Sequence, residues 1–220
     1  MKKTNAMREL DKNKIKYEFK EYEVDENDLS AIAVSLKTGE DITKIFKTLV
    51  LLNEKKEMIV ACIPGADTID LKKLAKIAGA KKVEMLELKE LFNMTGYIRG
   101  GCSPIGIKKR HQSFIHQSAL TKDYIMISAG VRGLQIIIEP QNLINYLKME
   151  VGDIRGMLAI ARKARGITQK ELAERCGLAE VTIRQYETGR RFPNAETLKR
   201  ITKELHVKIV VIPERKLGGE

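Results

Sequence analysis

The sequence predicts an α+β protein of two domains, and three observations carry this prediction. Over the first two thirds of the chain, β-branched apolar runs mix with short helical patterns without strict alternation, which is typical of a mixed, largely antiparallel, barrel-like sheet. After residues 151–156 the pattern changes to helices with short connections. The length of 220 residues exceeds that of most single domains. We therefore expect a sheet domain over residues 1–153 and a small all-α domain with a C-terminal strand over residues 154–220.

The elements of the first domain follow from apolar spacing and from turn residues. Residues 4–14 carry apolar side chains at helical spacing, and residues 17–24 have an extended pattern. The apolar runs Ile45 to Leu52 and Met58 to Ile63 flank a polar turn, which predicts a β-hairpin. Further along we expect helices from Leu71 to Ala78 (capped by Asp70 and closed by Gly79), Leu88 to Met94 and Asn142 to Lys148, and strands at Val83 to Leu86, Ser113 to Gln117, Tyr124 to Ser128 and Leu134 to Ile138.

The second domain is expected to hold four helices and one strand. Residues Val207 to Ile212 alternate as in a strand, but a lone strand is unstable in water. Pairing with its copy in a second subunit is one solution, so we expect a homodimer. The helices are expected at Met157 to Ala164, Gln169 to Cys176, Val181 to Glu187 and Ala195 to Leu205.

Composition narrows the functional class. A formal net charge of +11 favours a polyanionic partner over a surface that is merely basic. No apolar run is long enough to cross a bilayer, and the Lys-rich N-terminus lacks the apolar segment of a secretory signal, so we expect a cytoplasmic protein without a membrane partner. Cys62, Cys102 and Cys176 are scattered, which argues against disulfides and a zinc site. No metal, nucleotide or flavin motif is present, so no cofactor is expected.

Two helices of the second domain surround a tight turn, as in a helix-turn-helix. Thr168 and Glu171 form a T-x-x-E capping box, and Gly177 permits the left-handed turn between the helices. Arg and Gln side chains can read purine edges in a major groove, while a helix N-terminus can hold a phosphate. A helical bundle kept for dimerisation or for tRNA docking is the alternative. The candidate DNA-binding residues are Thr168, Gln169, Glu180, Thr182, Arg184, Gln185 and Arg190.

This domain resembles the XRE family of phage-repressor-like helix-turn-helix proteins. The motifs that carry the resemblance are T-Q-x-E-L-A from Thr168, the turn Gly177-Leu178, T-I-x-x-Y-E from Thr182, G-R-R from Gly189, and Pro193. The resemblance implies DNA binding. Ala179 departs from the family, which usually has Ser or Thr at that cap.

Two features of the first domain suggest a site. Lys47 lies within an apolar strand, where a lysine more often extends to solvent. The loop from Gly96 to Gly106 holds glycines that let a backbone approach a ligand and direct N–H groups at an oxygen, although a plain long turn is equally compatible. Lys108, Lys109 and Arg110 follow the loop and are placed to grip an RNA end, or form a solvated charge run.

The first domain resembles the YbaK/EbsC group of Cys-tRNA(Pro) deacylases, which are related to the editing domain of prolyl-tRNA synthetase. The resemblance extends to about residue 150. Its motifs are Tyr22 in E-Y-E, Lys47 in F-K-T-L, D-L-K-K-L-A-K from Asp70, G-A-K-K-V-E-M from Gly79, T-G-Y-I-R-G-G-C-S-P-I-G from Thr95, and R-G-L-Q-I from Arg132.

The resemblance implies hydrolysis of the aminoacyl ester of a mischarged tRNA, with the substrate's own thiol or ribose hydroxyl assisting. It implies that Lys47 holds the tRNA 3′ end or the developing negative charge, and that Tyr22 orients the terminal ribose or adenosine. Backbone N–H groups of the element from Gly100 through Gly101 to Pro104 would bind the scissile carbonyl. The partners implied are tRNA and prolyl-tRNA synthetase. The expected substrate-binding residues are Ser103, Pro104, Arg132 and Gln135.

Two residues depart from this family. Gln135 stands where the better-known deacylases carry Asp, and an amide is neither a base nor a counter-charge for Lys47. Cys102 lies in the loop where a small apolar residue is common, and packing is the more expected role for it than nucleophilic attack. We expect an active deacylase that also binds DNA. A transcription regulator that senses aminoacyl-tRNA or amino acid, and a pure binding module that tethers tRNA or a synthetase, are the alternatives.

Overall fold

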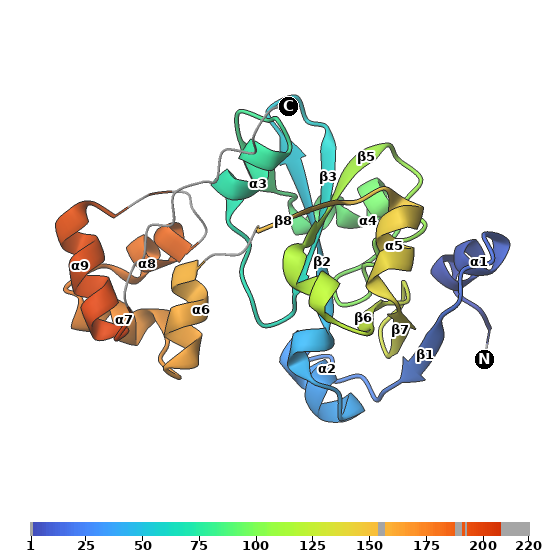
Figure 1. Ribbon diagram of the computed structural model, residues 1–220, viewed down its shortest axis with the longest axis horizontal. Helices are drawn as coiled ribbons and strands as arrows, with labels where there is room; N and C mark the ends of the chain where they lie inside the picture. Colours follow the sequence, from blue (N-terminus) through green and yellow to red (C-terminus); the bar gives the residue numbers. More distant parts are fainter. Residues whose placement is uncertain (1, 154–156, 188–190, 192, 208–220) are drawn as a thin grey trace, which may run out of the picture. The chain divides into compact units, whose positions relative to one another are not determined.

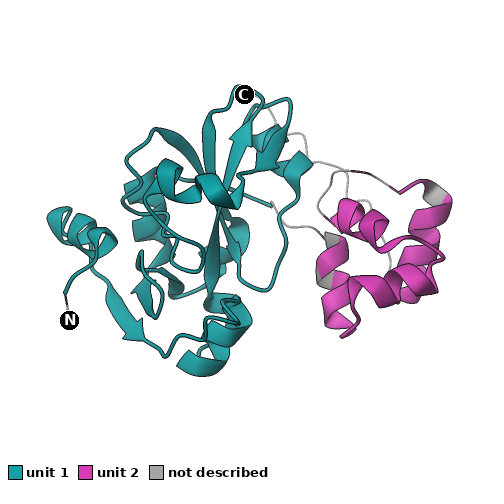
Figure 2. Cartoon of the chain, turned by 180° about the vertical axis from the view of Figure 1, so that it is seen from behind, with its two compact units in different colours: residues 1–156 teal, residues 157–220 magenta. Residues whose placement is uncertain are grey.

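The computed structural model describes residues 2–153, 157–187, 191 and 193–207. The chain divides into two compact units, residues 1–156 and 157–220 (Figure 2). Each unit has its own hydrophobic core. In the part of the chain that the structure describes, no helix combines the length and the apolar composition needed to span a bilayer.

Unit 1 contains two β-sheets. The first has three antiparallel strands in the order β1-β7-β6, and the second has five strands in the order β4-β2-β3-β5-β8. The pairs β3–β5 and β5–β8 are parallel, and the others in the second sheet are antiparallel, which confirms the mixed, largely antiparallel expectation. The strands are β1 (Glu18–Glu21), β2 (Phe46–Asn53), β3 (Met58–Pro64), β4 (Val83–Met85), β5 (His111–His116), β6 (Ile125–Ser128), β7 (Leu134–Ile138) and β8 (Glu150–Gly152).

The barrel-like closure expected from the sequence is the part of the fold that the structure corrects. Among the described residues the two sheets are joined by a single bridge, between Ile45 and Met126. Strand β2 pairs with β3 along nearly its whole length and with β4 at its far end. Only the start of β2 is therefore left to meet β6, and a continuous ladder between the sheets does not form.

Helices and the smaller sheet cover the two faces of the five-stranded sheet (Figure 1). Successive residues of a strand point to opposite faces, so Ala61 and Cys62 of β3 enter different cores. Helix α3 (Leu71–Ile77) covers the Ala61 side, and its N-terminus is capped by Asp70 as expected. The Cys62 side is covered by α1 (Asn5–Lys12), α5 (Pro140–Leu147) and the three-stranded sheet.

Helix α2 (Ala31–Thr38) was not expected from the sequence, although its local signals are clear. The Ser30 hydroxyl accepts a hydrogen bond from the backbone N–H of Ala33, and Gly39 ends the helix with a φ of 70°. The remaining helical segments of unit 1 are α4 (Leu91–Thr95) and the 3₁₀ turns η1 (Ile42–Lys44), η2 (Leu88–Glu90) and η3 (Gln117–Thr121).

Unit 2 is helical, as expected. Its helices are α6 (Met157–Ala164), α7 (Gln169–Arg175), α8 (Glu180–Glu187) and α9 (Ala195–Glu204), and Leu172, Ile183, Ile201 and Leu205 form its core. The predicted strand from Val207 to Ile212 lies, beyond its first residue, outside the described residues. The dimer inferred from that strand stays a prediction.

Candidate functional site

A cavity of about 350 Å³ lies between α2, the start of β2, the loop after α4 and the β6–β7 hairpin. Its volume suits a small ligand such as an amino-acid side chain with part of a ribose. It has an apolar half and a polar half, and no Asp or Glu stands among the described residues that line it. The lining residues are Leu29, Ala31, Val34, Ile45, Phe46, Lys47, Thr48, Leu49, Arg99, Gly100, Cys102, Ser128 and Gln135.

Lys47 provides a positive charge in this cavity. It is half-buried on β2, opposite Ile63 of β3, and its Nζ donates a hydrogen bond to the carbonyl oxygen of Gly65 at 2.9 Å. The lysine therefore does not simply extend to solvent. Its Nζ is held by the backbone of the turn that follows β3.

Gly65 is required by close packing. A Cβ atom at this position would lie 2.2 Å from the Cβ of Ala31 at the start of α2. The Gly65 N–H also donates to the carbonyl of Ile45 at 2.7 Å. The absence of a side chain thus lets α2 approach the turn that holds Lys47.

The glycine loop turns sharply at the rim of the cavity. The N–H of Gly101 donates to the carbonyl of Ile98 at 3.0 Å, and Gly100 between them has a φ of 82°. That sign of φ is what a type II turn requires at its third residue. The N–H of Gly101 is taken up by this turn. The N–H groups of Gly100 and Cys102 have no partner within the described residues, and both residues line the cavity.

Gln135 lies in the cavity wall with an unused amide. It is 5% exposed on β7, opposite Ser128 of β6, which also lines the cavity. Its side chain makes no hydrogen bond to any residue that the structure describes. The amide atoms are not among the fully buried polar atoms that lack a partner, so they are open to the cavity, where a ligand can meet them.

The thiol of Cys102 is not poised for attack. Burial raises its pKa to about 12, and the residue packs against the apolar cluster around Val60. The thiolate is the nucleophilic form, so this cysteine is unreactive near neutral pH. His111 and His116 hydrogen-bond to the carbonyl of Lys109 and to Asp153, respectively.

Tyr22 and Arg132 lie beside the cavity and do not line it. Both line a separate surface groove of about 550 Å³. Arg132 donates from Nε to the carbonyl of Arg99 at 2.9 Å and pairs with Glu26, so it holds the loop that forms the cavity rim. Tyr22 packs against the apolar cluster of Val34, Ile45 and Met126, of which the first two line the cavity.

Ser103 and Pro104 are buried residues of the loop itself and also lie outside the cavity lining. The Ser103 hydroxyl accepts from the N–H of Ile105 at 3.3 Å, so this side chain shapes the loop. Tyr97, which the sequence reasoning passed over, also shapes the loop, because its hydroxyl donates to the Ile105 carbonyl at 2.6 Å.

Sequence reasoning missed three contributors to the cavity. Arg99 and Ser128 line it, and α2 supplies Ala31 and Val34. Arg99 lies inside the glycine-loop motif, and the Ser30 cap marks the start of α2. Nothing local marked Ser128, because its place depends on the pairing of β6 with β7.

The candidate DNA-binding residues of unit 2 lie on a formed helix-turn-helix. The capping box of Thr168 and Glu171 is present at the start of α7, and Gly177 has a φ of 61° in the turn, both as expected. On α8, the side chains of Glu180 and Arg184 are exposed, and Thr182 and Gln185 are partly exposed. Arg190 lies outside the described residues.

Gln169 serves the interior of unit 2. Its side-chain amide donates to Glu187 at 2.7 Å, and Arg162 binds the same carboxylate through two nitrogens at 2.5 and 3.1 Å. Arg162 and Glu187 are 7% and 1% exposed. This charged network ties α6, α7 and α8 together. In the part of the chain that the structure describes, no group of three His, Cys, Asp or Glu side chains is arranged to hold a metal ion.

Comparison with known proteins gives two family matches. Residues 26–146 match the model of the aminoacyl-tRNA editing domain, and residues 158–212 match a helix-turn-helix model. The Enterococcus faecalis protein named "Putative Cys-tRNA(Pro)/Cys-tRNA(Cys) deacylase EbsC" is 45% identical over 152 residues, which cover 69% of this chain and 93% of that protein.

Solved structures share the fold of unit 1. The crystal structure of hypothetical protein APE2540 aligns with a TM-score of 0.64 at 16% identity, over 69% of this chain and 99% of that one. The crystal structure of a "putative trans-editing enzyme for prolyl tRNA synthetase" aligns with a TM-score of 0.61 at 18% identity, over 69% of this chain and 94% of that one.

Proposed function

Since this chain belongs to the family of aminoacyl-tRNA editing domains and carries a helix-turn-helix domain after it, we propose that it hydrolyses the aminoacyl ester of mischarged tRNA. Cys-tRNA(Pro) is the substrate we favour, on the strength of the relative's name. One observation carries the proposal. The Lys47 ammonium, the N–H groups of Gly100 and Cys102, and the unpartnered Gln135 amide belong to one small cavity without a carboxylate among its described lining residues.

The chemistry asks little of the protein beyond placement and charge stabilisation. Water adds to the ester carbonyl carbon, the bond to the ribose oxygen breaks, and the proton passes to that departing oxygen. The negative charge that develops on the carbonyl oxygen is stabilised by Lys47 and by the N–H groups of Gly100 and Cys102. Gln135 orients the aminoacyl group, and the substrate's own hydroxyl or thiol assists the attack.

The remaining candidate residues act outside the cavity, by positioning its rim and loop or by contacting another part of the substrate. In this proposal Arg132 positions the rim through Arg99, while Ser103 and Pro104 keep the loop in shape. Tyr22 meets the terminal ribose or adenosine outside the cavity, at the groove that it shares with Arg132. Gly101 contributes the turn that presents its two neighbours.

Specificity follows from cavity size and shape. A synthetase pocket cannot strongly reject a similar small amino acid, and a second site can remove the error. The apolar part of this cavity, formed by Ala31, Val34 and Ile45, suits the side chain of cysteine or alanine. The side chain of proline closes into a ring with its backbone nitrogen, so a proline ester needs a cavity of a different shape.

Single-turnover hydrolysis of Cys-tRNA(Pro), Ala-tRNA(Pro) and Pro-tRNA(Pro) by the full chain tests the substrate. We expect rapid loss of the Cys ester and sparing of the Pro ester. Equal rates for all three esters would contradict the proposed specificity, and an Ala ester that disappears faster than the Cys ester would reassign it.

A second candidate is a regulator that senses aminoacyl-tRNA or an amino acid. Gln135 favours it, because an amide in this position cannot act as a base. Binding of the ester without hydrolysis would support this function. In either case we propose that the helix-turn-helix binds DNA, with Arg184 and Gln185 of α8 facing base edges and Thr168, Gln169, Glu180, Thr182 and Arg190 contributing around them.

The setting follows from these partners. We propose that the protein works in the cytoplasm on tRNA and DNA, with functional modules at residues 1–153 and 154–220. Prolyl-tRNA synthetase is a proposed partner because its errors would be the substrate. The proposed homodimer is tested by sedimentation, where a monomer at micromolar concentration would contradict it.

A further inference from the structure

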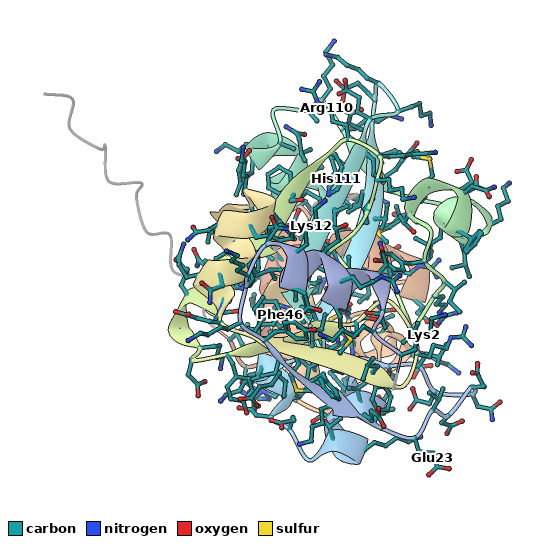
Figure 3. The ribbon with its side chains drawn as sticks, turned by 90° about the vertical axis from the view of Figure 1, so that its right-hand side faces the viewer. Lys2, Lys12, Glu23, Phe46, Arg110 and His111 are labelled. Carbon is teal, nitrogen blue, oxygen red and sulfur yellow. The ribbon has the colours of Figure 1, made fainter. Side chains whose placement is uncertain are left out.

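A second concave surface is lined by both ends of the glycine loop, at Gly96 and Gly106. It has a volume of about 490 Å³ and is formed where the first turns of α1 meet α4 and the segment after the loop. Figure 3 views this side of unit 1: α1 runs across the front with Lys2 and Lys12 near its two ends, and α4 lies toward the Lys2 end. We call it the α1–α4 groove; it is lined by Asn5, Arg8, Phe92, Asn93, Met94, Thr95, Gly96, Tyr97, Gly106, Lys108 and Lys109.

The charges of the α1–α4 groove are all positive and have no internal counter-charge. Arg8, Lys108 and Lys109 line it, and no Asp or Glu stands among its described lining residues. Arg8 donates to the carbonyl of Lys3, and Lys109 lies 3.3 Å from the sulfur of Met94. Within the described residues none of these three cations pairs with a carboxylate, whereas Lys3, Lys56 and Lys89 each do.

An exposed aromatic ring completes the chemistry. Phe92 on α4 is 62% exposed, although a ring of this size is normally buried in a monomer. Proteins bind a single strand of nucleic acid with a row of cations beside an aromatic ring. The cations contact the phosphates of the strand, and a base stacks on the ring. A groove that binds a protein would instead be expected to present a larger apolar area, or its partner would have to supply all of the acidic groups.

The α1–α4 groove is joined to the Lys47 cavity by the glycine loop itself. Gly96 lines the groove and Arg99 lines the cavity. Arg99 is the third residue after Gly96, so their backbones are at most about 11 Å apart. Asn5 also donates to the Gly106 carbonyl at 3.4 Å, which ties α1 to the other end of the loop.

We propose that the α1–α4 groove binds the RNA strand that delivers its 3′ end to the Lys47 cavity. Lys108, Lys109 and Arg8 contact its phosphates, and Phe92 stacks on an unpaired base. This inference rests on the proposed deacylation for the direction in which the strand runs, but the groove's affinity for RNA is measured independently of hydrolysis.

The test measures how tightly the full chain binds a fluorescent acceptor-stem minihelix that carries no amino acid and has a single-stranded CCA end. The affinity is measured over a range of salt concentrations. Lys108→Ala with Lys109→Ala should weaken binding about tenfold and lower the slope of log affinity against log salt by about 1.4, as expected for two lost phosphate contacts on a single strand. Phe92→Ala should weaken binding about tenfold without changing the slope.

Two matched variants serve as controls. Lys81→Ala with Lys82→Ala removes the same charge from an exposed turn elsewhere in unit 1 and should change affinity by less than twofold. Arg184→Ala with Gln185→Ala tests unit 2. The inference is overturned if the groove variants bind as the Lys81 and Lys82 control does, or if only the variant of unit 2 loses RNA.

Hydrolysis gives a separate readout. With an aminoacylated minihelix, the groove variants should raise the half-saturating enzyme concentration about tenfold and leave the limiting rate unchanged. If the wild type hydrolyses no ester while the groove variants still bind RNA more weakly, the proposed function is wrong and the proposed RNA-binding groove is supported.

Discussion

At the scale of single residues, burial separates Cys102 from Lys47 although both line one cavity. Because burial raises the pKa of the Cys102 thiol to about 12, the thiolate is scarce near neutral pH. Lys47 is half-buried with its Nζ on the Gly65 carbonyl, so its charge is held where a substrate can reach it.

Cys102→Ala therefore tests the nucleophile interpretation. We expect the variant to deacylate within about threefold of wild type, with the same pH dependence between about pH 6 and 9, because no thiolate forms there. Rate constants measured across that range check this. A loss of about 100-fold or more, or an inflection that disappears with the thiol, would show that the sulfur takes part.

Gln135 shows where sequence reasoning stops at this scale. Its departure from the family pattern was visible in the sequence, but its burial and its unused amide were not. Those depend on β7 lying between β1 and β6, which brings Gln135 opposite both Lys20 and Ser128. The cavity is lined by residues from segments that are distant in sequence. Local motifs therefore indicated Lys47 and the glycine loop but not the rest of the cavity wall.

At the scale of elements, the position of α2 depends on Gly65. Gly65→Ala would drive a Cβ into Ala31, so we expect unfolding to become easier by about 1–3 kcal/mol. Deacylation should also slow, since the carbonyl that holds Lys47 must move with the turn. Urea denaturation and single-turnover rates, both measured where the variant is folded, check the two effects.

Gly39→Ala is the matched control for that prediction. Gly39 has a φ of 70° at the end of α2, but a Cβ atom at this position would meet no described atom within 4 Å, so the substitution strains the backbone alone. It should cost stability and leave the rate unchanged. Equal rates in the Gly65 and Gly39 variants would contradict the link from α2 to Lys47.

The charged network of unit 2 gives a second prediction for elements. Glu187→Ala leaves Arg162 buried without its carboxylate, which should cost about 3–5 kcal/mol, comparable to the whole stability of so small a domain. Denaturant unfolding, monitored by circular dichroism, should then show that the helices of unit 2 are lost at a lower denaturant concentration. Unit 1 should unfold at the same concentration as in the wild type. Glu84→Ala, at the exposed pair with Lys56, should change nothing measurable. A single transition at the wild-type midpoint would contradict the role of the network.

Most helices and the first hairpin were predictable because their signals are local. The four helices of unit 2 lie within a residue of their expected ends, and the hairpin of β2 and β3 forms as expected. Strand β8 was missed because three residues carry little pattern and its parallel partner β5 is far away in sequence. The open pair of sheets could not be foreseen for the same reason: closure depends on long-range pairing.

At the scale of the whole molecule, two units with separate cores match two families, an aminoacyl-tRNA editing domain and a helix-turn-helix. Arg184→Ala with Gln185→Ala should abolish retention on a DNA target selected from random sequence, because both side chains lie on α8, the helix that we propose enters the major groove. Its deacylation rate should equal that of wild type. A slower rate would show that the units are coupled, and unchanged DNA retention would remove α8 from the proposed interface.

The central claim is that Lys47 and the loop beside it hydrolyse an ester, and one measurement tests it most directly. Single-turnover deacylation of Cys-tRNA(Pro) is followed with wild type, Lys47→Ala and, as a control of equal charge change, Lys55→Ala in the exposed hairpin turn. We predict that Lys47→Ala loses about 100-fold or more in rate while Lys55→Ala retains it. Equal hydrolysis by all three proteins, or none by the wild type, would contradict this account.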